Sequence, residues 1–184
     1  DAADGGTFEV FNPYDNSLLA NVAEAKHEDI DRAVTAARNA FPAWAGMAPS
    51  DRGVLIGKLA DAIEKDRDNI ALIESLDTGH PIRDTHNLDV LRTVATYRYF
   101  AGMPDKNEGT VIPVDPGFLN YVQRVPVGVV GQIVPWNFPL MFTSWKLGPA
   151  LAAGNTVVMK QAELTPLSTL RVAELAREVG FPPG

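Results

Sequence analysis

The feature that most constrains the fold is an apolar strand, a helix and a second apolar strand in close succession. Residues 129–134 (VVGQIV) are rich in valine and isoleucine, which is typical of a strand buried on both faces of a sheet. A helix is predicted from about 140 to 153, ended by a glycine C-cap at Gly154, and residues 156–160 (TVVMK) form the second strand. The whole spans about 31 residues, which is the size of one βαβ unit with parallel strands.

The C-terminal end of the chain adds one more helix to this unit. Thr165 is predicted to cap it, with Pro166 at its first position. Its buried side is predicted to consist of Leu164, Leu167, Leu170, Leu175 and Val179. A third strand is expected next, but residues 181–184 (FPPG) form a turn and the chain stops there. The sequence therefore predicts an α/β fold that starts a Rossmann-like parallel sheet and is incomplete, with an open strand edge.

The chain before residue 108 is predicted to hold a hairpin and several helices. The hairpin spans 8–22 around a cluster of turn-forming residues. Pro42 should kink or end the first helix, Ser50 should cap the second, and Gly79 should stop the third. The apolar stripes of four helices run through 30–44, 55–63, 70–76 and 90–101.

Two further strands are predicted at 110–113 and 118–125, separated by a turn with the sequence Asp-Pro-Gly. These elements divide the chain into three parts. Residues 1–108 form the hairpin and the helices, 109–127 form the two strands around the Asp-Pro-Gly turn, and 128–184 form the βαβα segment.

Composition and charge exclude several classes of function. The 184 residues carry a net charge of −7 with a pI near 4.9, which argues against nucleic-acid or anionic-membrane partners. No apolar run approaches the roughly 20 residues that span a bilayer, and the first residues lack the pattern of a signal peptide. The expected location is therefore cytoplasmic.

Cysteine and histidine usage points away from metal and thiol chemistry within this chain. The sequence contains no cysteine, so the chain supplies no thiolate and forms no disulfide. Its three histidines have no partner at the spacing of metal ligands, and each is interpreted as a surface or turn residue. They are His27, His80 and His86.

Polar residues at the two strand ends are the candidates for chemistry. Glycine loops of the GxGxxG and GxxxxGK[ST] types are absent. Asn137 follows the first strand between two prolines and can donate to an oxyanion, although asparagine is also common in simple turns. Lys160 and Glu163 follow the second strand and could hold the hydroxyls of a ribose, or lie in a solvated loop. Lys146, among apolar neighbours, fits a snorkelling side chain.

Longer stretches resemble the aldehyde dehydrogenase superfamily. They are 135–139 (PWNFP), 145–155 (WKLGPALAAGN), 157–160 (VVMK), 163–167 (ELTPL) and 180–184 (GFPPG). Shorter pieces agree in order and spacing at 11–13 (FNP), 36–41 (AARNAF), 76–79 (LDTG) and 126–131 (PVGVVG). The resemblance covers essentially the whole chain and favours the functional interpretation of Asn137, Lys160 and Glu163 over the simpler ones.

The resemblance implies a site in which an aldehyde is oxidised by NAD(P) through a cysteine thiohemiacetal. Asn137 would donate to the oxyanion, and Lys160 with Glu163 would hold the adenosine ribose. The residues Val134, Pro135 and Trp136 would line the cofactor cleft. Glu163 would favour NAD over NADP, because a carboxylate repels a 2′-phosphate.

Further roles follow from the same resemblance. Lys146 corresponds to a lysine with a proton-relay role in some members, and Asp89 with the backbone near Val10 and Phe11 corresponds to a monovalent-cation site. The strands at 110–125 resemble an oligomerisation segment, which implies a homodimer or homotetramer. Gln161 departs from a proline found in many members, and a looser loop is the expected effect.

The family's nucleophilic cysteine and general-base glutamate would lie beyond Gly184. The resemblance therefore implies the N-terminal part of an aldehyde dehydrogenase, which is inactive by itself. The alternative is a non-catalytic module that dimerises with, or regulates, a longer relative. A cysteine and a glutamate encoded downstream would separate the two hypotheses.

Overall fold

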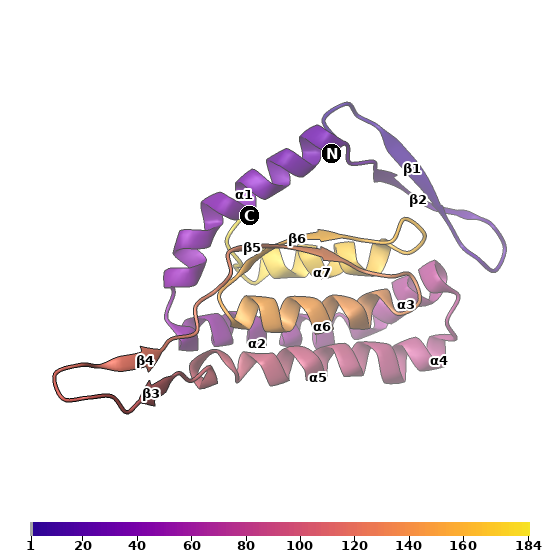
Figure 1. Cartoon of the computed structure of the whole chain (residues 1–184). Coiled ribbons are helices and arrows are strands. Elements are labelled where there is room, and N and C mark those ends of the chain that lie inside the picture. Colours follow the sequence, from indigo (N-terminus) through magenta and orange to yellow (C-terminus); the bar gives the residue numbers. More distant parts are fainter. Residues whose placement is uncertain (1) are drawn as a thin grey trace.

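The computed structural model describes residues 2–184 and has the shape of a helical layer with two hairpins attached (Figure 1). The helices that lie side by side are α2 (Pro49–Lys65), α3 (Arg67–Thr78), α5 (Val90–Ala101), α6 (Pro139–Ala152) and α7 (Leu167–Glu178). A pair of strands, β5 (Val129–Ile133) and β6 (Thr156–Lys160), lies over α6 and α7. An N-terminal hairpin of β1 (Thr7–Phe11) and β2 (Leu18–Ala23) lies at one end of the molecule, and a hairpin of β3 (Thr110–Ile112) and β4 (Asn120–Val122) projects from the other. This mixed α/β architecture agrees with the predicted fold class.

The N-terminal hairpin forms where the sequence predicts it. Strands β1 (Thr7–Phe11) and β2 (Leu18–Ala23) pair antiparallel, with Thr7 opposite Ala23. The turn between them closes on Asn12, whose side-chain oxygen accepts the Tyr14 N–H over 3.0 Å. Such side-chain to backbone bonds are the reason that asparagine favours turns.

Helix α1 (His27–Gly46) continues through Pro42, so of the two predicted effects, a kink or an end of the helix, the end does not occur. Tertiary contacts beyond the proline outweigh the missing N–H, which typically costs about 3 kcal/mol. Trp44 is 2% exposed, stacks on Phe181 with ring centroids 5.4 Å apart, and donates from its indole nitrogen to the Leu151 carbonyl over 3.2 Å.

Helices α2 and α5 follow the predicted stripes, α2 with a shifted start, whereas Ile30 in α1 and Leu76 in α3 are exposed. Helix α2 (Pro49–Lys65) begins at its proline, which suits the first helical position, so Ser50 lies inside the helix instead of capping it. Helix α3 (Arg67–Thr78) ends at Gly79, whose φ of 79° is left-handed, as predicted. The chain continues through α4 (Ile82–Asp84), the π-helical turn η1 (Thr85–Asp89), α5 (Val90–Ala101) and the 3₁₀ turn η2 (Pro104–Lys106).

One hydrophobic core joins α2, α3, α5, α6 and α7. Its largest fully buried members are Tyr97, Ile56, Leu59, Ile63, Ile70 and Leu140. Within residues 2–184, no helix is both long enough and apolar enough to cross a bilayer.

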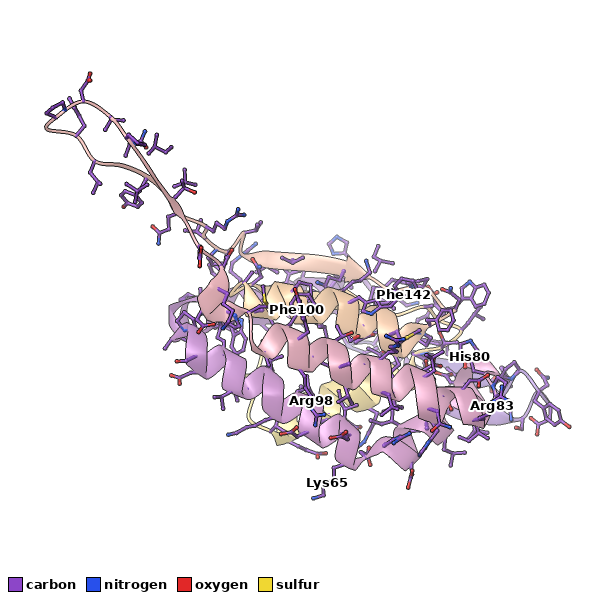
Figure 2. The ribbon with its side chains drawn as sticks, turned by 90° about the horizontal axis from the view of Figure 1, so that it is seen from below. Lys65, His80, Arg83, Arg98, Phe100 and Phe142 are labelled. Atoms are coloured by element: carbon purple, nitrogen blue, oxygen red, sulfur yellow. The ribbon has the colours of Figure 1, made fainter. Side chains whose placement is uncertain are left out.

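The projecting hairpin is shorter than predicted. Strands β3 (Thr110–Ile112) and β4 (Asn120–Val122) pair antiparallel, and every residue in them is exposed. Gly117, with a φ of 98°, completes the predicted turn between them. The hairpin stands away from the core (Figure 2), so its apolar side chains face solvent in this chain.

The βαβα segment has the predicted order and parallel pairing. It consists of β5 (Val129–Ile133), α6 (Pro139–Ala152), β6 (Thr156–Lys160) and α7 (Leu167–Glu178). Strand β5 pairs with β6 in parallel, with Val129 opposite Thr156. Gly154, with a φ of 87°, lies in the turn between α6 and β6.

The prediction that β5 is buried on both faces is wrong. Successive side chains of a strand point to opposite faces. Gln132 and Val134 point toward α6, because Gln132 donates from Nε2 to the Lys146 carbonyl over 2.9 Å and Val134 is 2% exposed. Ile133, on the other face, is 71% exposed. Helices α6 and α7 cover one face of the two-stranded sheet, α1 also contacts both strands, and Ile133 near the carboxyl end of β5 stays exposed.

The helix α7 also differs in detail from its prediction. It begins at Leu167, with Pro166 one position before it and Thr165 two positions before it. Leu164 precedes the helix and is 68% exposed, and Leu170 is 42% exposed, so neither belongs to its buried side. Val172 and Leu175 fill that role, at 1% and 3% exposed.

Candidate active site

The loops that follow β5 and β6 lie next to each other at one edge of the sheet. Ile133 is opposite Lys160 in the parallel register, so both strands enter their loops at the same edge. The Val134 N–H donates to the Lys160 carbonyl over 3.0 Å and extends the pairing by one residue. We call 134–138 the first site loop and 160–165 the second site loop. Open α/β sheets bind ligands at this carboxyl edge.

The first site loop presents its polar and aromatic groups to solvent. Trp136 is 60% exposed, and Pro135 and Asn137 on either side of it are also exposed. The Thr165 hydroxyl donates to the Trp136 carbonyl over 3.3 Å and so ties this loop to the second site loop. The Asn137 amide can donate two hydrogen bonds, and its exposure leaves it accessible to a ligand.

The second site loop holds a cation and an anion in contact. The Lys160 ammonium lies 2.6 Å from the Glu163 carboxylate and 2.9 Å from the Gln161 carbonyl. The hydrogen bond from Lys160 lowers the pKa of Glu163 below its usual value, so Glu163 is ionised at neutral pH. Both side chains are more than half exposed. Such a pair is easily exchanged for bonds to a ligand, because water screens it.

The geometry of this pair fits the two adjacent hydroxyls of a ribose. An ammonium offers only donors and a carboxylate only acceptors, whereas a hydroxyl can do both. Lys160 can donate to one hydroxyl while Glu163 accepts from its neighbour, at the 2.6 Å spacing that the two groups already have. A dinucleotide cofactor bound here would present that diol.

Lys146 lies on α6, the helix that follows the first site loop. It is the eighth residue of that helix. It is partly buried, and its carbonyl accepts the bond from Gln132. Its proton-relay role stays a prediction.

The residue Asp89 is buried and paired with a histidine. One of its carboxylate oxygens lies 3.0 Å from Nδ1 of His80, and Asp89 is 1% exposed. His80 lies in the turn after α3, as interpreted, but its pairing with Asp89 was not foreseen. The signal is tertiary, because the two residues are nine positions apart in sequence. The monovalent-cation role of Asp89 stays a prediction, and the described residues contain no cluster of three metal-ligating side chains.

His80 also connects helix α3 to the first site loop. Its ring packs against Phe138, with centroids 5.0 Å apart and planes at 59°. Figure 2 shows His80 at the end of the molecule opposite to the β3–β4 hairpin. The candidate site and the β3–β4 hairpin therefore lie at opposite ends of the folded molecule.

Two buried carboxyl groups beside the site loops were missed by the sequence interpretation. Glu74 is fully buried and Asp77 is 2% exposed. Burial raises the pKa of Glu74 to about 8 and that of Asp77 to about 7. The available signal was helical spacing, since both residues share the buried stripe of α3 with Ile70.

Two cavities are present, and the first reaches Gln161 of the second site loop. One, of about 750 Å³, lies among α1, α6, β6 and α7, lined by Trp44, Leu147, Leu151 and Phe181 among others. The other, of about 560 Å³, lies between α5 and α6 and is lined by Arg92, Tyr99, Met141 and Trp145 among others. Neither is lined by Asn137, Lys160 or Glu163.

A parallel strand pair with polar side chains on its carboxyl-edge loops is typical of the α/β class, in which open sheets bind ligands at that edge. Sequence comparison narrows this class. The profile described as "Aldehyde dehydrogenase family" matches residues 1–184, and the chain belongs to that family.

Relatives of known sequence and structure agree. The chain is 50% identical over 187 residues to the human mitochondrial aldehyde dehydrogenase and 50% identical over 182 residues to an aldehyde dehydrogenase of Emericella nidulans. These matches cover 100% and 98% of this chain, but 36% of each relative.

Solved structures are similar over the same extent. The chain resembles a structure titled a putative aldehyde dehydrogenase from Burkholderia cenocepacia with 65% identity and a TM-score of 0.98, covering 100% of this chain and 37% of that one. PnpE in complex with nicotinamide adenine dinucleotide has 63% identity and a TM-score of 0.98, covering 100% and 38%. The chain thus spans somewhat more than a third of the length of the relatives that it matches.

Proposed function

We propose that the gene product containing this chain oxidises an aldehyde to a carboxylic acid and transfers the hydride to NAD. The observation that carries this proposal is the adjacency of the two site loops, one with the Asn137 amide and the other with the Lys160–Glu163 pair. NAD supplies the hydride acceptor when bound. The part of the site in this chain would bind the cofactor and stabilise charge on the aldehyde oxygen.

The role proposed for Asn137 follows from the charge that develops in the reaction. When a nucleophile adds to an aldehyde, the carbonyl oxygen becomes negative, and a fixed donor stabilises it. An amide does this without adding a charge of its own. The hydrogen bond from Thr165 to the Trp136 carbonyl restrains the backbone next to Asn137. Lys146 is proposed only as a proton-relay group.

Cofactor binding is assigned to both site loops. Lys160 and Glu163 would hold the adenosine ribose, while Pro135 and Trp136 provide exposed apolar surface across the edge and Val134 maintains the strand pairing beneath them. The ionised Glu163 disfavours the 2′-phosphate of NADP. Two structures similar to this chain, PnpE and a Bacillus cereus aldehyde dehydrogenase, are NAD complexes, which supports NAD as the cofactor.

Self-association is proposed for the β3–β4 hairpin. Monomers rarely expose contiguous apolar surface of this kind. The exposed apolar side chains of the hairpin and its flanks include Val111 (70%), Phe118 (79%), Leu119 (76%), Tyr121 (59%) and Val125 (69%). We infer a homodimer or homotetramer, in which these side chains pack against another copy. Residues 109–127 would then form an oligomerisation segment between the helical part (1–108) and the cofactor-binding part (128–184). The cytoplasmic location stays a prediction.

The test is to purify the gene product, mix it with NAD and several aldehydes, and follow NADH absorbance. Turnover that requires both reactants is expected. The second candidate is a non-catalytic module that dimerises with, or regulates, a longer relative, and the residues up to Gly184 fit both candidates equally. Association with a longer relative in the absence of any turnover would support that candidate and contradict the first.

A further inference from the structure

The last turn of helix α3 lies beneath both site loops. Glu74 and Asp77 are three residues apart and therefore share one face of the helix. Each accepts a backbone N–H from the first turn of a different helix, although Glu74 also lies beside the Ser168 side chain on α7. A Glu74 oxygen accepts the Leu140 N–H over 3.4 Å at the start of α6, and an Asp77 oxygen accepts the Leu167 N–H over 2.8 Å at the start of α7.

These two helix starts are the C-terminal anchors of the site loops. Helix α6 follows the first site loop directly, and α7 follows the second. The first N–H groups of a helix have no partner within the helix. A buried acceptor that binds one of them therefore fixes where the helix begins and where the preceding loop must end.

Further contacts join the same parts. The Thr165 hydroxyl donates to the Trp136 carbonyl, and His80, just after α3, packs on Phe138. Helix α3 and the two site loops thus form a closed set of contacts.

The burial of both carboxyl groups suggests a role beyond filling the core. A buried polar group costs free energy unless it is well bonded. One Asp77 oxygen has no hydrogen-bond partner among the described residues. An apolar side chain would remove that cost, but would also release the Leu167 N–H.

We propose that Glu74 and Asp77 are positioning residues that set the two site loops separately. Glu74 sets the loop that carries Asn137, and Asp77 sets the loop that carries Lys160 and Glu163. The inference rests on the proposed function, because it assigns consequences to a dehydrogenase site.

The test compares apolar and isosteric variants of the gene product. Glu74→Leu should lower kcat about ten- to a hundredfold through misplacement of Asn137, with the KM for NAD within about twofold. Asp77→Leu should raise the KM for NAD about tenfold while kcat at saturating NAD stays within about threefold. Glu74→Gln and Asp77→Asn retain an acceptor and should restore nearly wild-type values.

The matched control is Thr93→Val. It removes another fully buried oxygen, on α5, whose hydroxyl has no partner among the described residues. It should leave thermal stability unchanged or raise it, because it removes an unsatisfied buried polar group, and it should change neither kcat nor the KM for NAD. If Glu74→Leu and Asp77→Leu change kcat and KM together, as a merely structural defect would, the proposal is wrong.

Hydrogen exchange provides a readout that does not need activity. Glu74→Leu should speed exchange in 138–142 and leave 165–169 protected, and Asp77→Leu should do the reverse. If the leucine variants do not fold, Glu74→Asp and Asp77→Glu are used, which displace the acceptor by one methylene. Each should speed exchange in the same segment as its leucine variant, but by a smaller factor. Equal loss of protection in both segments contradicts the proposal.

One further arm separates this inference from the proposed function. Suppose that Asn137→Ala and Glu163→Gln alter catalysis and cofactor use, but that the Glu74 and Asp77 variants change kcat and the KM for NAD together. Then only the positioning role is contradicted. If Asn137→Ala and Glu163→Gln change nothing, the proposed function fails, while the exchange pattern still decides whether α3 positions the loops.

Discussion

The Lys160 ammonium lies 2.6 Å from the Glu163 carboxylate at the carboxyl edge of the β5–β6 pair. The two residues are three positions apart in sequence, and both side chains are more than half exposed. This pair places a donor and an acceptor where a diol can replace their mutual contact. The most direct predictions concern this edge.

Cofactor choice is expected to depend on Glu163. The gene product should use NAD with a kcat/KM at least about tenfold above that for NADP, equivalent to roughly 1.4 kcal/mol. Glu163→Gln should narrow this ratio, because it removes the charge that repels the 2′-phosphate. Glu174→Gln, an exposed carboxylate on α7, is the control and should leave the ratio unchanged. An unaltered NAD preference in Glu163→Gln would show that another group selects the cofactor.

Catalysis is expected to depend on the Asn137 amide. Asn137→Ala in the gene product should lower kcat by about 10²–10³, the usual cost of one oxyanion donor. The affinity for NAD, measured by fluorescence titration, should change little. The control is Asn107→Ala, at another exposed asparagine that lies outside the site loops, and it should leave kcat unchanged. A kcat within about threefold of wild type would assign Asn137 to the turn only.

The 184-residue chain by itself is expected to lack dehydrogenase activity. A thiolate is the nucleophile expected to hold the aldehyde while the hydride leaves, and this chain contains no cysteine. Incubation of the purified chain with NAD and aldehydes should give no NADH above a blank without protein. Turnover from material free of any longer enzyme would overturn the assignment of roles.

Thermal stability is expected to fall as the pH rises through the range in which Glu74 and Asp77 ionise. Burial raises the pKa of Glu74 from 4.5 to about 8 and that of Asp77 from 3.8 to about 7. The folded protein therefore binds more protons than the unfolded chain between these values, and the free energy of unfolding decreases with pH there. The stabilisation is complete below about pH 4 and is lost by about pH 8.

The measurement is the Tm of the gene product at pH 5 and at pH 8. Glu74→Gln and Asp77→Asn cannot ionise, so each should narrow the difference in Tm between the two pH values. Thr93→Val should leave that difference as in wild type. A difference equally large in the glutamine and asparagine variants would mean that other groups cause the pH dependence.

Self-association is expected to require the β3–β4 hairpin. Val111→Asp combined with Tyr121→Asp places charges on its exposed apolar surface and should shift the gene product toward monomers in light scattering. Val54→Asp, at a valine on α2 that is 54% exposed, is the matched control. An oligomer that persists in the double variant would place the interface elsewhere.

Local sequence signals determined the elements whose cause is itself local. The parallel β5–β6 pair follows from two β-rich runs separated by a helix-length segment, and α3 ends at Gly79 because glycine accepts the left-handed conformation. The candidate site residues could be selected because they lie in the loops after those strands, and the parallel register places both strand ends at one edge of the sheet. They are Asn137, Lys160 and Glu163. The family resemblance added the roles that local patterns could not.

Tertiary structure decided the features that depend on what packs against each residue. Helix α1 continues past Pro42 because Trp44 is buried against distant segments, and Ile133 is exposed because α6 and α7 cover the opposite face of the sheet. The links from Glu74 to Leu140 and from Asp77 to Leu167 span 66 and 90 residues. Sequence periodicity reports which face of a helix is buried, but it cannot report which distant backbone group lies there. That depends on how the helices pack, and packing is set by the whole core at once.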